Sequence, residues 1–156
     1  MATYFADTTF WIALSSRRDQ YHSRAVQWHE FVTHSGSKIV TTEAVLWEWL
    51  NALSDPSTRG VAAEGYRRAH ADVNVEVVRF QTELIDAAVA LYGARPDKGW
   101  SLTDCFSFVV MDRSSLTEAL TTHRHFEQAN LKARMLEQPV GRAVGHPPRV
   151  TRISGR

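Results

Sequence analysis

The stretch SLTDCFSFVVMDRSSLTEALTTHRHF, residues 101–126, decides the fold that the sequence predicts. Apolar residues at helical spacing follow an acid, Asp104, in the first helical turn, where free N–H groups and the helix dipole favour an anionic side chain. Residues 118–122 then form a predicted buried strand, which ends at the ionisable tip HRHF. Because α/β folds bind ligands beside such strand ends, Asp104 is the first candidate for a functional residue.

The composition excludes several classes of protein. The chain has 156 residues, of which 44% are hydrophobic and 22% charged, as is typical of one globular domain with a substantial core. Its formal net charge of +1 means that any contact with nucleic acid needs a local basic patch. No apolar run is long enough to span a membrane, and no signal-like pattern opens the chain. We therefore expect a cytoplasmic protein without membrane contact.

Working outward from this stretch, short apolar strands alternate with helical segments. Strands are predicted at residues 3–7, 38–41, 73–78 and 118–122, with a last edge strand at 133–136. Because helices separate the strands throughout, the sequence predicts an α/β fold with a mostly parallel sheet of four to five strands between helical layers. We expect one domain over residues 1–138 and a basic, flexible tail over residues 139–156.

Two further acids stand at positions comparable to that of Asp104. Asp7 ends the first predicted strand, which places it at the carboxyl edge of the sheet, although it can equally be a simple helix cap. Glu48 lies between two tryptophans of an otherwise apolar helix, and the alternative is an ordinary surface position. The apolar pattern of that helix predicts Trp47 on its buried side. Glu43 points about 140° away from Glu48 and cannot serve the same site.

Carboxylates gathered in one crevice repel one another unless a cation neutralises them. Oxygen ligands of this kind select Mg²⁺ or Mn²⁺ rather than zinc. A Mg²⁺ ion that keeps several waters suits phosphodiester hydrolysis, because it activates the attacking water and stabilises charge on the leaving oxygen. The three acids therefore suggest a metal-dependent phosphodiesterase.

Four motifs carry a resemblance to a known family. In order they are FADTTFWIAL at 5–14, VLWEWLNAL at 45–53, SLTDCFSFVVM at 101–111 and TTHRHFEQANL at 121–131. In order and spacing they resemble PIN-domain proteins of the VapC-like toxin type, over residues 3 to about 136. The resemblance implies a three-layer α/β/α sandwich and a ribonuclease site that uses Mg²⁺, with Mn²⁺ as an alternative. It also implies the toxin role of a type II toxin–antitoxin pair, with RNA as substrate, a cognate antitoxin as partner and a homodimer as assembly.

The same resemblance assigns roles to residues. Asp7, Glu48 and Asp104 match the family's first three acids and are the expected catalytic metal ligands. Side chains expected to orient ligands or water are Thr8, Asn51 and Thr103. Basic residues expected to hold the RNA backbone are Arg17, Arg18 and Arg124. The tryptophans either fill the core or stack on RNA bases if they are exposed.

His123 departs from the family pattern, because the string T-D-R-H-F usually has an acid at this position. A neutral imidazole binds Mn²⁺, whereas Mg²⁺ prefers oxygen. Two outcomes stay open: His123 is a metal ligand or phosphate contact, or it degrades the site and leaves an RNA- or protein-binding module. Asp112 cannot replace the missing acid, since about 12 Å of helical rise separates it from Asp104. His125 and Phe126 are expected to brace the strand end.

Overall fold

The computed structural model describes residues 1–140 and contains one five-stranded sheet. The strands are β1 (Thr3–Ala6), β2 (Lys38–Thr42), β3 (Val75–Val78), β4 (Glu118–Leu120) and β5 (Lys132–Ala133). Their order is β3-β2-β1-β4-β5, and every neighbouring pair is parallel. The predicted α/β fold with a parallel sheet is therefore confirmed. The expected tail, residues 139–156, lies outside the described residues from position 141 onward.

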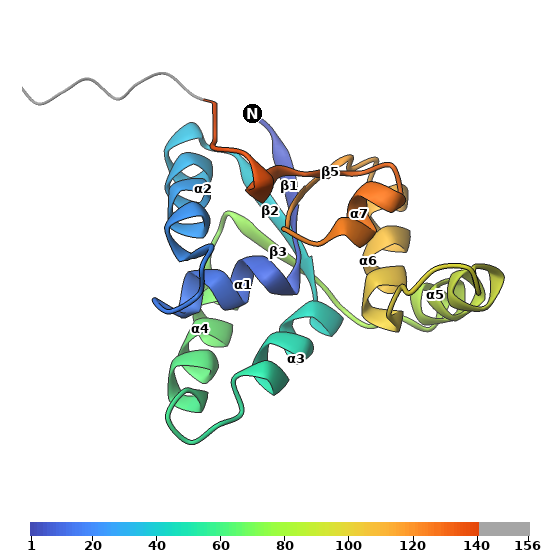
Figure 1. Cartoon of the computed structure of the whole chain (residues 1–156), viewed down its shortest axis with the longest axis horizontal. Helices are drawn as coiled ribbons and strands as arrows, with labels where there is room; N and C mark the ends of the chain where they lie inside the picture. The colour runs from blue at the N-terminus through green and yellow to red at the C-terminus, as the bar shows by residue number, and fades with distance from the viewer. Residues whose placement is uncertain (141–156) are drawn as a thin grey trace, which may run out of the picture.

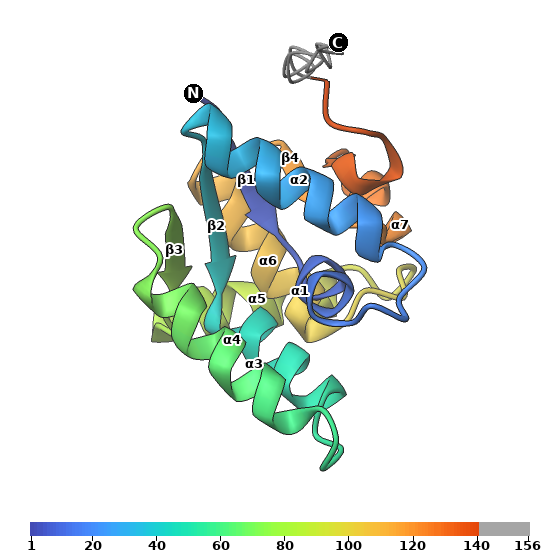
Figure 2. The ribbon, with the colours of Figure 1, turned by 90° about the vertical axis from the view of Figure 1, so that its left-hand side faces the viewer.

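Helices flank the sheet on both sides (Figure 1). One side carries α1 (Thr8–Ser15), α2 (His22–Ser35) and α4 (Arg59–Ala71), and the other carries α5 (Thr82–Ala94), α6 (Leu102–Arg113) and α7 (Arg124–Gln128). Helix α3 (Glu43–Ala52) continues directly from the end of β2. Figure 2 shows α2 and α4 lying across the face of the sheet. This is the predicted arrangement of three layers. None of the helices within residues 1–140 has the length and apolar character needed to cross a bilayer.

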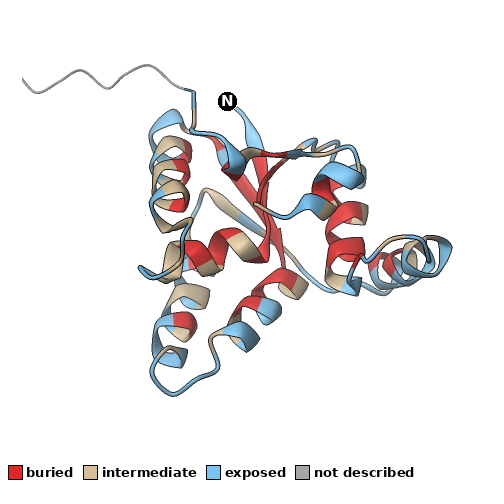
Figure 3. Cartoon of the chain, viewed as in Figure 1, coloured by how far each residue is buried: buried red, intermediate tan, exposed pale blue. Residues whose placement is uncertain are grey.

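The hydrophobic core lies on both faces of the central strand β1. Phe5 is fully buried, and its ring lies 6.2 Å from that of Phe126, which in turn packs edge-on against Phe108 at 5.0 Å. On the other face, Tyr4 packs edge-on against the fully buried Trp28. Burial of each such side chain contributes roughly 1.5–3 kcal/mol. Figure 3 shows the buried residues gathered in the sheet and on the helix faces turned toward it.

The strand order creates a switch point beside β1. From β1 the chain adds β2 and β3 on one side, and it later adds β4 and β5 on the other. The connections therefore diverge at the carboxyl ends of β1 and β4, and such a point is where open α/β sheets bind ligands. Asp7 follows β1 directly and so stands at this point.

The end of β4 differs from the prediction. The strand ends at Leu120 rather than at residue 122. The Asp7 N–H donates a hydrogen bond to the Leu120 carbonyl at 3.2 Å, and beyond this bond the chain turns toward α1. There the Thr122 N–H donates to Thr9 Oγ1 at 3.3 Å. Side-chain hydroxyls of α1 thus replace the strand partner that the sequence pattern implied.

Two consequences follow for the C-terminal segment. Helix α7 begins at Arg124, so His125 and Phe126 lie in a helix and not at the end of a strand. The predicted last edge strand is present, but its bounds differ from 133–136: β5 covers only Lys132–Ala133, and a 3₁₀ turn follows at Arg134–Leu136.

The prediction that Trp47 lies on the buried side of α3 is wrong. Val45, Leu46 and Trp49 are buried, whereas Trp47 is 60% exposed and contacts Phe80 edge-on at 5.5 Å. Positions 45, 46 and 49 form a single stripe on a helix, and position 47 lies on the opposite side. The residues that this stripe meets on α1 and α4 decide which face is inside.

Candidate active site

Asp7 is a buried carboxylate at the switch point, with only 4% of its surface exposed. It occupies the N-cap position of α1, yet its side chain makes no capping hydrogen bond. Instead, Oδ2 accepts a hydrogen bond from Thr121 Oγ1 at 2.9 Å, and Thr9 Oγ1 lies 3.4 Å from the same oxygen. The residue is therefore more than a helix cap, because its carboxylate joins β1 to the end of β4.

The surroundings of Asp7 disfavour its negative charge. Burial raises the pKa of Asp7 from 3.8 to about 6. Hydrogen bonds from the Thr8 backbone N–H and the Thr121 hydroxyl oppose this rise, while the carboxylates of Asp104 and Glu48 add to it. Within residues 1–140, no lysine or arginine forms an ion pair with Asp7. A buried carboxylate without a cationic partner is costly, and a bound divalent cation removes that cost. The oxygen-rich surroundings fit Mg²⁺ or Mn²⁺.

Glu48 reaches the site from the middle of α3. Its side chain is exposed, but Oε2 accepts a hydrogen bond from Thr8 Oγ1 at 2.8 Å. Thr8 is itself buried in the first turn of α1, directly after Asp7. Because Thr8 directly follows Asp7, this bond holds the glutamate near Asp7.

Asp104 reaches the site from the first turn of α6, as the sequence predicted. It forms a capping box with Ser101: the Asp104 N–H donates to Ser101 Oγ, and Asp104 Oδ2 accepts from the Ser101 N–H, each at 3.0 Å. His125 Nδ1 lies 2.8 Å from the same Oδ2. The residue is 7% exposed, and it combines a structural role in the helix with a place at the site.

The tightest group of metal-binding side chains in residues 1–140 differs from the three predicted acids. Asp104, His123 and His125 offer ligand atoms that all lie within 4.8 Å of one another, and Asp7 and Glu48 are not in this group. His125 was missed, because it was expected to brace the strand end. The spacing His-x-His, beside the position where an acid was expected, was the available signal.

The remaining predicted residues are distributed unevenly. Asn51 and Thr103 line a groove of about 370 Å³ together with Glu48, so three predicted residues share one surface. Arg124 is exposed and follows His123 at the start of α7.

The other two predicted arginines lie farther away. Arg17 and Arg18 are exposed and lie beyond the C-terminal end of α1. The eight residues of α1 span about 12 Å, and Asp7 precedes the first of them. These two arginines are therefore too far from Asp7 to contact the same phosphate, and they can reach only a distant part of an extended substrate.

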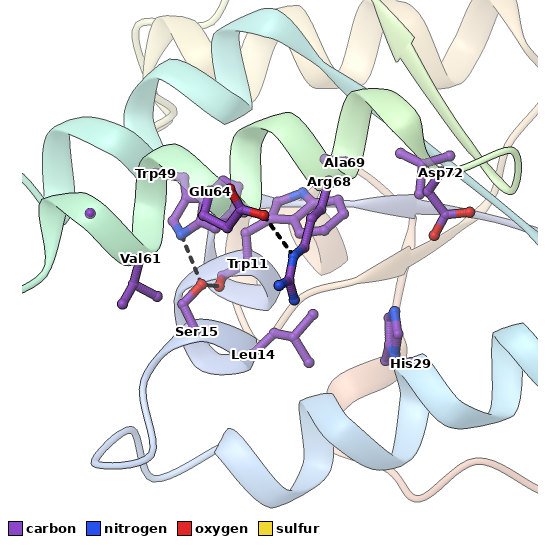
Figure 4. A pocket seen from close by; sticks show the side chains of 13 residues that line it. Trp11, Leu14, Ser15, His29, Trp49, Val61, Glu64, Arg68, Ala69 and Asp72 are labelled. Carbon is purple, nitrogen blue, oxygen red and sulfur yellow. Dashed lines mark hydrogen bonds and ion pairs between the residues drawn. The ribbon is translucent and has the colours of Figure 1, made fainter.

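A separate apolar pocket of about 610 Å³ lies between α1, α2, α3 and α4 (Figure 4). The stacked rings of Trp11 and Trp49 are 5.5 Å apart, and Trp49 Nε1 donates to Ser15 Oγ at 3.1 Å. Glu64 and Arg68 pair at its edge. This pocket includes none of the three predicted acids, so we do not place the chemistry there.

Comparisons with known proteins identify the family and the fold of the chain. The chain matches the PIN domain family over residues 4–131. It resembles the crystal structure of VapC20 from Mycobacterium tuberculosis, described as a Sarcin-Ricin loop cleaving toxin, with a TM-score of 0.74, 22% identity and coverage of 87% of this chain and 99% of that one. It also resembles VapBC2 from Rickettsia felis bound to a DNA fragment from their promoter, with a TM-score of 0.61, 14% identity and coverage of 83% and 96%. No curated protein matches the sequence. At these identities the two structures establish the fold.

Proposed function

The chain belongs to the PIN-domain family, and on this premise we propose that it is a Mg²⁺-dependent endoribonuclease, the toxin component of a type II toxin–antitoxin pair. One observation carries the proposal. The carboxylate of Asp7 is buried at the switch point of a parallel sheet, and Asp104 and Glu48 lie close enough to raise its pKa. A buried carboxylate with a perturbed pKa at such a point is typical of a catalytic site.

Asp7, Glu48 and Asp104 would hold the metal ion, directly or through water, with Mn²⁺ as an alternative to Mg²⁺. When bound, the ion supplies an activated water and charge stabilisation for hydrolysis of an RNA phosphodiester. The Thr121 hydroxyl orients the Asp7 carboxylate, and the Thr8 hydroxyl orients that of Glu48. These contacts leave the acids pre-positioned before an ion arrives.

The RNA backbone needs a basic contact near the acids, since the net charge of the chain is only +1. Arg124 is the best placed of the three proposed arginines, because it is exposed and adjacent to His123. Asn51 and Thr103 share the groove with Glu48 and are proposed to contact the substrate or its water. Arg17 and Arg18 are proposed to contact more distant phosphates.

We also propose a homodimer and a cognate antitoxin as partners. The support for a dimer is an apolar stripe on α5, in which Ile85, Val89 and Tyr92 are exposed at helical spacing. Val89→Asp should convert a dimer into a monomer in sedimentation analysis, whereas Glu83→Ala should not.

The support for an antitoxin is the likeness in fold to VapBC2, whose description pairs two proteins.

Cleavage of RNA by the purified protein, free of any antitoxin, tests the main proposal. We expect cleavage that needs Mg²⁺ or Mn²⁺, that stops with a chelator and that Asp104→Asn abolishes. Asp112→Asn is the matched control, because Asp112 is an exposed acid of the same helix. Ser101→Ala is a second control: it removes the helix cap, at a cost of about 1 kcal/mol of stability, and keeps the carboxylate. Metal-independent cleavage, or equal loss in all three variants, contradicts the proposal.

The second candidate function is an RNA- or protein-binding module without nuclease activity. The observation that favours it is His123, an imidazole at the position where the family usually has an acid. Comparison of ion binding and RNA cleavage between the wild type and His123→Asp discriminates between this function and the nuclease.

A further inference from the structure

We propose that Asp104, His123 and His125 form a nitrogen-rich metal site that binds Zn²⁺, and other divalent ions that accept imidazole, in preference to Mg²⁺. The observation is the cluster itself, in which one ligand atom from each residue lies within 4.8 Å of the others. This inference goes beyond the proposed nuclease, because it concerns ion binding and holds whether or not RNA is cut.

Before any ion binds, the chain fixes the Asp104 side chain and the backbone that carries the two histidines. Asp104 is fixed by its capping box with Ser101. The His123 N–H donates to Thr121 Oγ1 at 3.0 Å, and this fixes the backbone at the start of α7. Phe126, fully buried in the core, anchors the same helix. The cluster therefore joins two rigid elements and does not depend on a loose loop.

The contacts within the cluster suit a common ion. Asp104 Oδ2 and His125 Nδ1 are 2.8 Å apart, and the rings of His123 and His125 meet edge-on with centroids 4.1 Å apart. The 2.8 Å contact is a hydrogen bond, so a shared tetrahedral zinc ion would displace its proton and hold the two atoms about 3.4 Å apart, given bond lengths near 2.0–2.1 Å. His123 is exposed, so rotation of its side chain closes the remaining distance without disturbing the core.

The donor set decides which ion is preferred. One carboxylate and two neutral imidazoles are typical ligands of zinc, and they leave a fourth position for water. Mg²⁺ binds oxygen and dehydrates reluctantly, so two imidazoles are poor ligands for it. Asp7 and Glu48, which offer oxygen alone, lie outside the cluster. Asp104 thus lies between the carboxylates of Asp7 and Glu48 on one side and the imidazoles of His123 and His125 on the other.

Calorimetric titration of the full chain with Zn²⁺, Mn²⁺ and Mg²⁺ tests the site, together with the visible absorption of bound Co²⁺. We expect Zn²⁺ to bind more tightly than Mg²⁺, and His123→Ala and His125→Gln each to weaken Zn²⁺ binding at least tenfold. Asp7→Asn and His34→Ala should leave it within about twofold, since His34 is an exposed histidine on α2 outside the cluster.

Electron spin echo measurements on bound Mn²⁺ should show coupling to imidazole nitrogen in the wild type and in Asp7→Asn, and should lose one nitrogen in His123→Ala. His123 is exposed, so this variant folds and carries the test even if His125→Gln does not. Unchanged Zn²⁺ affinity in His123→Ala, or an equal loss in His34→Ala, would overturn the site. Loss of RNA cleavage in Asp7→Asn with Zn²⁺ binding intact separates this proposal from the nuclease proposal.

Discussion

Thr8 Oγ1 donates a hydrogen bond of 2.8 Å to Glu48 Oε2, and this bond joins the first turn of α1 to the middle of α3. The two residues are 40 positions apart in the sequence. An exposed glutamate normally samples several rotamers, whereas this one has a fixed partner beside Asp7. The buried hydroxyl of Thr8 therefore positions Glu48, and substitution of Thr8 can test this role.

Thr8→Val should lower metal-dependent RNA cleavage by about 10- to 150-fold, because a hydrogen bond to a charged group contributes roughly 1.5–3 kcal/mol. The loss should show mainly as a higher Mg²⁺ concentration at half-maximal activity. Thr8→Ser keeps the hydroxyl and should stay within about twofold of the wild type. Equal activity of the valine and serine variants would show that the bond does not position Glu48.

Asp7→Asn should stabilise the metal-free protein, and the gain should depend on pH. The pKa of Asp7 is raised to about 6 in the folded state, so the folded protein binds more protons than the unfolded chain between pH 4 and 6, and the wild type loses stability as the pH rises through that range. The advantage of the variant should therefore be close to zero near pH 4 and reach about 2–3 kcal/mol above pH 6.

Urea unfolding at several pH values, in the presence of a chelator, measures this difference. Saturating Mg²⁺ should reduce or reverse it, because the ion binds only the folded wild type. Asp112→Asn changes an exposed carboxyl and should show no such dependence. A difference between Asp7→Asn and wild type that is constant across pH would exclude a strained carboxylate at this position.

His123→Asp should shift the metal preference of the site toward Mg²⁺. The substitution restores an oxygen ligand, and Mg²⁺ prefers oxygen to imidazole. We expect at least tenfold tighter Mg²⁺ binding than in the wild type by calorimetry, and RNA cleavage at lower Mg²⁺ concentrations. His123→Ala, which removes the imidazole without adding an acid, should gain no Mg²⁺ affinity.

The same pair of proteins separates the two candidate functions. If the wild type neither binds a divalent ion nor cleaves RNA, and the aspartate variant does both, the wild type is a binding module and the nuclease proposal fails.

Gly65→Ala should destabilise the fold, although alanine is the better helix former. A Cβ atom at Gly65 would lie 2.5 Å from Cη2 of Trp49, a buried indole that stacks on Trp11 and donates a hydrogen bond to Ser15. We expect a loss of about 1–3 kcal/mol, which is typical of an overpacked core. A Cβ at Gly60, in the same helix, meets nothing within 4 Å. Gly60→Ala is therefore the control, and thermal unfolding should show it to be neutral or slightly stabilising.

The sequence predicted the features that depend on neighbouring residues. The apolar runs predicted where strands and helices alternate, and this alternation implied the parallel sheet. The strand that runs up to Asp7 and the helix with Asp104 in its first turn were likewise visible as local patterns. In each case the determining contacts lie within about four residues, which is the range that helical and strand periodicity report.

Only the tertiary structure decided which residues meet. Thr121 bonds to Asp7 across 114 positions, and His125 meets Asp104 across 21. The exposed face of α3, with Trp47 outside, also depended on which helices packed against it. The strand order determines these encounters, because it brings the ends of β1 and β4 together, and no local pattern encodes that order. The sequence alone thus determined the elements and the candidate acids, whereas packing of the whole chain placed two histidines beside Asp104.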